Sequence, residues 1–477
     1  MQLRKYLLTV LSISCSIISY AQQDTVLTLQ QCLDIAIKNN LNVKQNGLAM
    51  MQDKIYLNQA RENLLPSISG SASRELSQGR GLSPVTNTYV NQSLTSDNYG
   101  LSGSITVFNG LALQSAIKQA SLAYQAGTMD FQSAKDLVTV NVITGYLSIL
   151  DADEVLGQSK SQLAVAKENL DRSEVLEKDG ANKVASDLTD FKGAYAQSQV
   201  NVVLAQNSLD AAKLNLFQLL NIPYNKNAKF QTLNAQDLGG QYGSNPDDIY
   251  GTALQQLAMV KAATLRRESA EKGVKVAQGQ LFPTLSLSGG ISTNYSSAGT
   301  KSVFIDSTTS AVPGLYVNTP TGKQSVFSTS ANNATQNISY GDQFKNNYGT
   351  YALLSLNIPI FLNHTKKNNV ALAKITLLNE QYIEDNIKIQ LKQSVEQAYY
   401  NMSAAYNRYQ SLKAQVDAYT ESYRIAKIRL DAGVLTSVDF IIAKNNLDGA
   451  NLNLISARYD YFIYSKVLDY YQGKLTF

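Results

Sequence analysis

Few residues in this chain are of a type that could catalyse a reaction or bind a metal ion. The only histidine, His364, lies in a predicted turn at residues 362–365, with no cysteine or second histidine to complete a metal site. The sequence has no glycine-rich phosphate loop and no G-x-S-x-G motif, and one histidine leaves little scope for a catalytic triad. Its carboxylates are scattered over predicted helices. We therefore expect no enzyme activity, no cofactor and no metal site.

The N-terminal segment, 1–21, has the organisation of an export signal. Arg4 and Lys5 precede an apolar stretch at residues 7–18, and residues 19–21 form a small-x-small cleavage site. Cys15 raises the alternative of a lipoprotein, but the residues before it do not fit the lipid-attachment motif. We expect ordinary cleavage after Ala21.

Composition excludes several further classes of protein. Cleavage would leave one cysteine, Cys32, so no intrachain disulfide can form, and its surroundings indicate a small buried residue on a helix. The signal holds two of the 41 basic residues, so the mature balance would be 39 basic (41 − 2) against 37 acidic residues. Nucleic-acid binding is therefore not expected. No later segment reaches 18 consecutive apolar residues, which argues against a helical membrane protein.

The elements that must carry the function are duplicated within the chain. Two short segments recur 217 residues further along the chain (259 − 42 and 282 − 65). Asn42-Val43-Lys44 corresponds to Met259-Val260-Lys261, and Leu65-Pro66-Ser67-Ile68 corresponds to Phe282-Pro283-Thr284-Leu285. Two later ones share a larger shift (360 − 107 = 431 − 178 = 253): Val107-Phe108 with Ile360-Phe361, and Lys178-Asp179-Gly180 with Asp431-Ala432-Gly433. A single jump in the shift (253 − 217 = 36) indicates one duplicated unit with one enlarged loop.

Each copy of the unit contains a very long predicted helical hairpin. Large residues alternate with small ones at an average spacing of 3.5, which is typical of coiled-coil packing. Residues 111–178 and 364–431 contain no proline, and an uninterrupted helix of that length would reach roughly 100 Å. Gly180 and Gly433 would end these helices. We expect antiparallel hairpins at about 111–220 and about 364–472.

Each copy also contains a pair of predicted strands, at about 67–108 and about 284–361. One face and the other alternate there with period 2: Leu101, Gly103, Ile105 and Val107 alternate with Ser102, Ser104, Thr106 and Phe108. One apolar face and one polar face are typical of strands in an outer-membrane barrel, but four strands are too few to close one. Oligomerisation is therefore expected. Residues 77–98 and 292–347 are predicted to be polar outward loops.

With this order of elements, the chain resembles the TolC family of outer-membrane efflux proteins over essentially its whole mature length. The most specific matching segments are residues 64–67 and 281–284 before the strands, residues 107–110 and 360–363 after them, and residues 219–223 and 429–440 in the hairpins. The resemblance implies a fold that is mainly α with a transmembrane β part. It implies repeat 1 at 22–223, a periplasmic linker or equatorial segment at 224–246, and repeat 2 at 247–477.

The resemblance also implies an assembly and a function. A homotrimer would form a twelve-stranded β-barrel in the outer membrane, continued by an α-helical tunnel in the periplasm. It would serve as the passive exit duct of a tripartite efflux or type I secretion system. Its partners would be outer-membrane lipid, a periplasmic adaptor (membrane fusion protein), and an inner-membrane transporter of the RND, ABC or MFS type.

The residues implied by the resemblance lie at the hairpin ends. Asp439 takes the place of an acidic ring that narrows the tunnel, and Ile442 stands where some members have a second acidic residue, which puts a double ring in doubt. The tips that meet the adaptor would include Gly180, Gly433, Val434 and Leu435. Asp439 also fits a simple helix-capping role, because a carboxylate favours a helix start.

Two alternative functions remain at this point. A periplasmic adaptor also carries a long helical hairpin, but it would have one hairpin flanked by compact β domains. A structural coiled coil without a membrane barrel would have no lipid-facing strands. The duplicated strand pairs argue against both alternatives.

Overall fold

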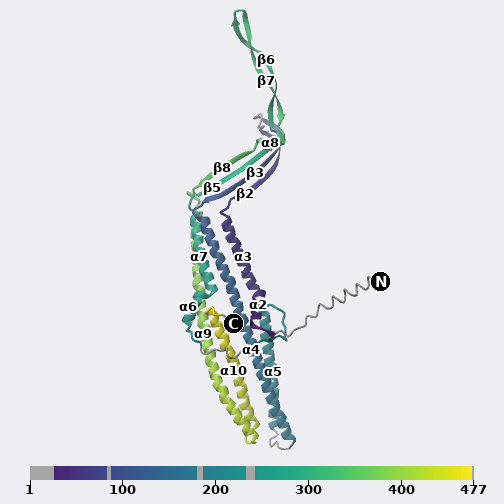
Figure 1. The fold of residues 1–477 in the computed structure, drawn as a ribbon, viewed down its shortest axis with the longest axis vertical. Coiled ribbons are helices and arrows are strands. Elements are labelled where there is room, and N and C mark those ends of the chain that lie inside the picture. Colours follow the sequence, from purple (N-terminus) through teal and green to yellow (C-terminus); the bar gives the residue numbers. More distant parts are fainter. Residues whose placement is uncertain (1–25, 83–86, 180–185, 233–241, 475–477) are drawn as a thin grey trace, which may run out of the picture. The chain divides into compact units, whose positions relative to one another are not determined.

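The computed structural model describes residues 26–82, 87–179, 186–232 and 242–474, so the predicted signal peptide, Cys15 and Gly180 lie outside the described residues. The chain divides into two units. One comprises residues up to 56 together with 119–270 and 375–477, and it contains most of the helical residues. The other comprises 57–118 and 271–374, and it contains the main sheet (Figure 1). No helix among the described residues is long and apolar enough to cross a membrane.

The duplication is visible in the lengths of the helices. Four helices of the first half each have a counterpart of identical length in the second half. The pairs are α2 (Leu29–Asn39) with α6 (Pro246–Gln256), α3 (Leu41–Glu62) with α7 (Ala258–Gly279), α4 (Ala112–Lys178) with α9 (Thr365–Asp431), and α5 (Ser186–Leu220) with α10 (Ser437–Tyr471). They have 11, 22, 67 and 35 residues respectively. The first two pairs share the shift of 217 residues (246 − 29 and 258 − 41), and α4 and α9 differ by 253 (365 − 112), as the sequence predicts. The starts of α5 and α10 differ by 251 (437 − 186).

The two 67-residue helices begin after the same unusual turn. Gly110 and Leu111 precede α4 with φ values of 66° and 62°, and Asn363 and His364 precede α9 with 48° and 60°. Two successive left-handed residues therefore recur at equivalent positions of the two repeats. A Cβ atom on Gly110 would lie 2.3 Å from the carbonyl oxygen of Gly279, so only glycine fits there. His364 is an exposed turn residue, as the sequence predicts.

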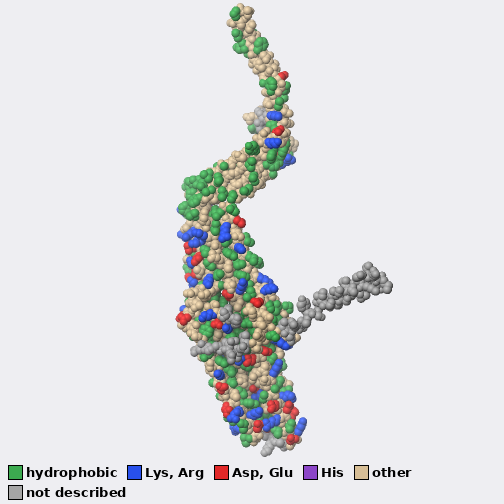
Figure 2. Space-filling model, in the orientation of Figure 1, with side chains coloured by type: hydrophobic (Ala, Val, Ile, Leu, Met, Phe, Trp, Pro, Cys, Tyr) green, Lys and Arg blue, Asp and Glu red, His purple; other side chains and the backbone are tan. Residues whose placement is uncertain are grey.

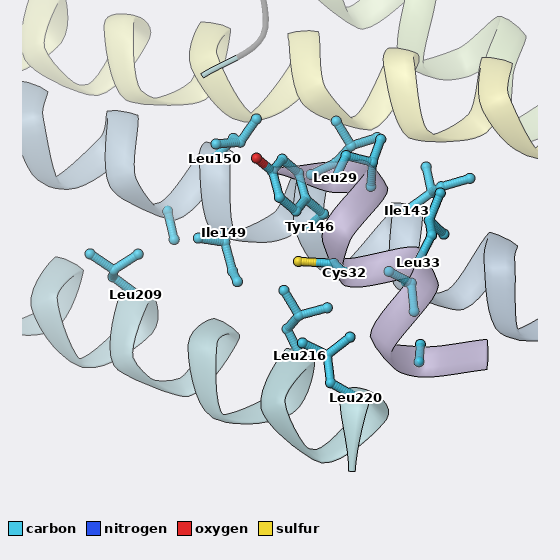
Figure 3. Packing of buried hydrophobic residues seen from close by; sticks show 14 of the residues in the cluster. Leu29, Cys32, Leu33, Ile143, Tyr146, Ile149, Leu150, Leu209, Leu216 and Leu220 are labelled. Carbon is cyan, nitrogen blue, oxygen red and sulfur yellow. The ribbon is translucent and has the colours of Figure 1, made fainter. Parts of the chain in front are cut away.

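The core of the helical unit joins α2 to α4 and α5. Figure 3 shows Leu216 and Leu220 of α5 directed towards Cys32 of α2. Cys32 is fully buried, and burial raises the pKa of its thiol to about 11. The Tyr146 hydroxyl, also in this core, lies 3.1 Å from the carbonyl oxygen of Leu27 and 2.8 Å from that of Gln231. Leu27 belongs to β1 (Val26–Leu27), and Gln231 follows β4 (Lys229–Phe230), with which β1 forms a short parallel pair.

The other unit is built on one antiparallel sheet to which both repeats contribute. The strand order is β2-β3-β5-β8, with bounds Ser67–Leu82, Tyr89–Phe108, Thr284–Ser296 and Gly349–Asn357. The register aligns Ile105 with Leu287 and Leu287 with Leu354, so one face is apolar. The other face carries serines, of which Ser67 and Ser104 are hydrogen-bonded at 3.0 Å. The predicted alternation is therefore confirmed, and the apolar face is largely exposed.

Both predicted polar loops are strands over most of their length. Strands β2 and β3 remain paired up to Leu82 and Tyr89, which shortens the first loop. The second region forms a separate two-stranded ribbon, β6 (Thr300–Thr319) and β7 (Gly322–Asn337), followed by the short helix α8 (Tyr340–Asn346). The loop prediction was wrong because serine, threonine and asparagine occupy both faces of the ribbon, so no apolar period marks its strands.

Candidate functional site at the ends of the helical hairpins

The end of α9 has the backbone geometry that the sequence predicts. Gly433 has a φ of 74°, the left-handed conformation that glycine adopts at little cost. The amide of Val434 donates to the carbonyl of Arg429 at 3.0 Å, and the amide of Gly433 donates to that of Leu430 at 2.9 Å. This pair of hydrogen bonds is a Schellman motif, which satisfies carbonyls at the helix end. Val434 is 65% exposed, whereas Leu435 is half-buried.

Asp439 belongs to the first turn of α10 and contacts the residue that caps it. The hydroxyl of Thr436 accepts a hydrogen bond from the Asp439 amide at 3.1 Å and donates to its carboxylate at 2.8 Å. The structure therefore assigns Asp439 a capping contact. Its carboxylate is nevertheless exposed, as is the side chain of Ile442 three residues further along. The role of both residues in a constriction of three chains stays a prediction.

The start of α10 is also joined to the start of α5, which belongs to the other hairpin of the same chain. Ser437 is 1% exposed, and its hydroxyl lies 2.7 Å from the carboxylate of Asp187 and 2.9 Å from that of Asp190. A hydroxyl has one proton, so it donates to one of these carboxylates at a time. Breaking this contact would leave two half-buried carboxylates facing one another.

An apolar cluster lies beside this polar contact and draws one residue from each of the four long helices. Phe440 is 1% exposed and packs against Phe191 and Tyr423, at ring-centroid distances of 6.3 Å and 5.5 Å. The buried members of the cluster are Leu170, Phe191, Ala426 and Phe440. Charged side chains cover the same end of the unit, where α5 and α10 begin (Figure 2). One ion pair there joins Arg172 of α4 to Asp431 of α9.

Further from the hairpin ends, a polar contact joins α4 to α10. The hydroxyl of Ser456 donates to the carboxylate of Asp151 at 3.2 Å, and Arg458 forms an ion pair with Glu154. The pKa of Asp151 is raised to about 6, chiefly by burial and in smaller part by the nearby carboxylates of Asp460 and Glu154. The Ser456 hydrogen bond and the Arg458 charge act in the opposite direction. This contact is therefore sensitive to pH near neutrality.

The sequence alone identified only part of this arrangement. It singled out Gly433, Val434, Leu435, Asp439 and Ile442, which the structure places within one short stretch at the start of α10 and the turn before it. It did not identify Ser437, Asp187, Asp190 or Arg172, because serine and aspartate in the first turn of a helix usually serve as caps. No signal in the sequence pairs residues 250 positions apart, as Ser437 and Asp187 are.

Comparisons with known proteins agree with this architecture. The family described as "Outer membrane efflux protein" matches residues 32–221 and 249–471. The chain is 24% identical to the outer membrane protein TolC of Escherichia coli over 418 residues, covering 85% of this chain and 74% of that protein. It is 22% identical to the toxin and drug export protein A of Aggregatibacter actinomycetemcomitans over 470 residues, covering 94% of this chain and 87% of that protein.

Solved structures show the same fold. The outer membrane protein VceC of Vibrio cholerae has a TM-score of 0.73 at 15% identity, covering 93% of this chain and 96% of that one. The CmeC outer membrane channel of Campylobacter jejuni has a TM-score of 0.69 at 19% identity, covering 94% and 86% respectively. The predicted resemblance is thus confirmed. Because the family match covers both repeats, this chain belongs to the outer membrane efflux protein family and is an outer-membrane efflux channel.

Proposed function

We propose that three copies of this chain form the exit duct of a tripartite efflux or type I secretion system. The observation that carries this proposal is the four-stranded sheet with two open edges, since β2 and β8 each pair with only one strand among the described residues. Lipid cannot satisfy an open strand edge, so a sheet in a membrane must close into a barrel. Three copies supply twelve strands, which lies within the range of known barrels.

The helical unit offers a second, independent support for association. Helix α3 exposes Leu41, Leu48, Met51 and Ile55, at intervals of 7, 3 and 4 residues. Helix α9 exposes Ile375, Leu378, Tyr382 and Ile389, at intervals of 3, 4 and 7 residues. Each of these large apolar side chains is at least 45% exposed. Both sets follow the a/d spacing of a coiled-coil seam, and no helix among the described residues covers them. Pairing of α3 with α9 of the next copy would cover both.

The partners follow from this architecture and from the names of the relatives. We propose that the hairpin ends around Gly433, Val434 and Leu435 dock onto a periplasmic adaptor, which links the duct to an inner-membrane transporter of the RND, ABC or MFS type. The duct itself is passive and catalyses no reaction. An export protein for toxins and drugs is among the relatives, which supports an export role. A separate adaptor or structural coiled coil would not combine two hairpins with a shared four-stranded sheet.

Membrane fractionation with a heat-modifiability gel tests this proposal. We expect the mature chain in the outer-membrane fraction, with an oligomer that resists detergent at room temperature and dissociates on boiling. Recovery of the chain in the soluble periplasm, without a detergent-resistant oligomer, would contradict the proposal.

A further inference from the structure

The ribbon formed by β6 and β7 has no partner elsewhere in the described residues. The two strands, of 20 and 16 residues, are joined by Pro320 and Thr321 and pair only with each other (Figure 1). Each strand therefore presents an unpaired edge. Isolated two-stranded ribbons are marginally stable in water, and unpaired edges are templates for association. A ribbon of this length calls for a physical explanation.

The base of the ribbon is fixed to the sheet by polar contacts of α8. Gln343 of α8 is 4% exposed, and its side chain accepts from the amide of Ser296 and donates to its carbonyl, both at 2.9 Å. The same side chain donates to the carbonyl of Ile338 at 3.1 Å. The hydroxyls of Tyr99 and Tyr340 form a further bond at 2.8 Å between the sheet and α8. The ribbon is thus anchored at its base, where β6 begins and β7 ends.

The register gives the ribbon two different faces. Thr309 lies opposite Thr329, with their hydroxyls 3.0 Å apart, and the same face carries Ala311 opposite Phe327. It also carries Phe304, and we call it the phenylalanine face; Phe304 and Phe327 are 60% and 63% exposed. The other face is polar, since the Asn332 amide donates to Asp306 at 2.8 Å and to Thr308 at 2.6 Å. That face also carries Ser310, Ser328 and Ser330, and nearer the base of the ribbon it carries Val303 opposite Ala334.

The low charge of the ribbon favours association with an identical ribbon over association with a charged surface. Residues 300–337 contain three charged residues, Lys301, Asp306 and Lys323, which give a net charge of +1. Figure 2 shows few charged side chains along the ribbon. So little charge offers no basis for recognising an acidic or basic surface, and it opposes association between identical ribbons only weakly. Apolar side chains continue towards the ribbon tip at Leu315, Tyr316 and Val317, each more than half exposed.

We propose that the phenylalanine faces of ribbons from neighbouring copies of this chain pack against one another. The inference rests on the proposed trimer, in which neighbouring copies must already cover the open edges of β2 and β8. Only three residues separate the end of β5 in that sheet from the start of β6 in the ribbon. Contact between the ribbons would therefore continue the contact between the sheet edges. Packing of Phe304 and Phe327 would remove exposed aromatic surface from water, which is favourable.

Crosslinking of the purified full chain in detergent tests the proposal. Phe327→Cys and Ser328→Cys place thiols on adjacent residues that point to opposite faces. Cys32 is a poor competitor, because it is fully buried and its pKa is raised to about 11. With a short bifunctional maleimide we expect a crosslinked dimer from Phe327→Cys, severalfold more than from Ser328→Cys. In a threefold arrangement one thiol of three stays unpaired, so the product is dimer plus monomer.

The outcomes separate this inference from the proposed function. An intact oligomer that crosslinks equally at both positions, or at neither, overturns the ribbon contact and leaves the duct proposal standing. A chain that forms no oligomer overturns the duct proposal itself. Crosslinking of Phe327→Cys to another surface protein in cells, with none between purified copies, also overturns the contact. As a second variant, Phe304→Ser combined with Phe327→Ser should lower the dissociation temperature of the oligomer, and an unchanged temperature contradicts the contact.

Discussion

At the scale of single residues, Asp439 combines a local contact with an exposed charge. Its bond with Thr436 stabilises the start of α10, and losing a carboxylate from the first turn costs roughly 0.3–1 kcal/mol. In the proposed constriction, its exposed carboxylate would lie near those of two other copies. The two roles make different demands, because capping needs a hydrogen-bond acceptor whereas a ring needs the charge.

Conductance measurements on Asp439 variants distinguish these roles. If three carboxylates form a ring, Asp439→Asn and Asp439→Ala should both weaken block by divalent cations in planar bilayers, since both remove the charge. If the residue only caps α10, Asp439→Asn should conduct and block as the unmodified chain does, since asparagine retains the acceptor. Equal cation block in all three proteins would exclude a charged constriction at this position.

Asp151 makes the contact between α4 and α10 depend on pH. Its pKa of about 6 in the folded chain exceeds the ordinary value of 3.8, so the folded state holds the proton more tightly. The resulting stabilisation is present in full below about pH 4 and is lost as pH rises through about 6. A difference of about two pKa units corresponds to at most roughly 3 kcal/mol.

Asp151→Asn should therefore stabilise the helical unit at neutral pH and leave it little changed near pH 4. Asparagine can still accept the hydrogen bond from Ser456, so the variant mainly removes the buried charge. Thermal unfolding followed by circular dichroism between pH 4 and pH 8 measures the effect. A stability difference that does not vary with pH would show that Asp151 is not the titrating group.

At the scale of elements, the contact between α5 and α10 holds the two hairpin ends of one chain together. Ser437→Ala removes the hydroxyl that lies between Asp187 and Asp190 and leaves their carboxylates without that donor. Loss of a partner from buried polar groups costs about 1–3 kcal/mol. We expect the hairpin ends to loosen and single-channel conductance to rise.

Ser198→Ala is the matched control for this variant. Ser198 lies on α5 and is also buried, but its hydroxyl donates to the carbonyl of Ala194 in the same helix, at 2.9 Å. Conductance should stay unchanged in the control. An equal effect of the two variants, or no effect of Ser437→Ala, would show that the Ser437 contact does not hold the hairpin ends together.

The exposed turn after α9 should be where the adaptor binds. Val434 is 65% exposed and contributes only its backbone to the Schellman motif, so Val434→Asp should keep the fold. We expect crosslinking to the adaptor to fall severalfold while the channel in planar bilayers is unchanged. Val438→Asp, with a 50% exposed side chain in the first turn of α10, serves as the control. Undiminished crosslinking would place the docking surface elsewhere.

The sequence predicts those elements in which residue type and period agree. The two 67-residue helices follow from uninterrupted heptad spacing, and their equal lengths follow from the repeat. The β6–β7 ribbon could not be predicted, because Thr309, Thr329 and Ser328 give both of its faces a polar character. A strand can be recognised from its period of two only where one face is apolar, as it is at Leu285, Leu287 and Ile291 in β5.

The hairpin-end site could be predicted only where backbone geometry limits residue choice. Gly433 could be identified because a left-handed turn favours glycine. Ser437 could not, because its two acceptors belong to another hairpin, and only the folded chain brings α5 and α10 together. Contacts between distant segments depend on packing, which one sequence does not encode in any local pattern.

At the scale of the whole molecule, one chain is an incomplete structure. Its sheet has two open edges among the described residues, and its helices α3 and α9 expose apolar stripes that match a coiled-coil seam. Both features are costly in a monomer, and neighbouring copies in the proposed trimer would cover both. The duplication would reduce the number of copies needed, since in the proposed trimer each chain would contribute two strand pairs and two hairpins to a single ring.

Native mass spectrometry of the complex extracted from outer membranes tests the proposed association of three chains most directly. We expect a mass of three mature chains, because three four-stranded sheets would close a twelve-stranded barrel. A complex that retains the mass of a single chain, under conditions in which the sheet is folded, would contradict it.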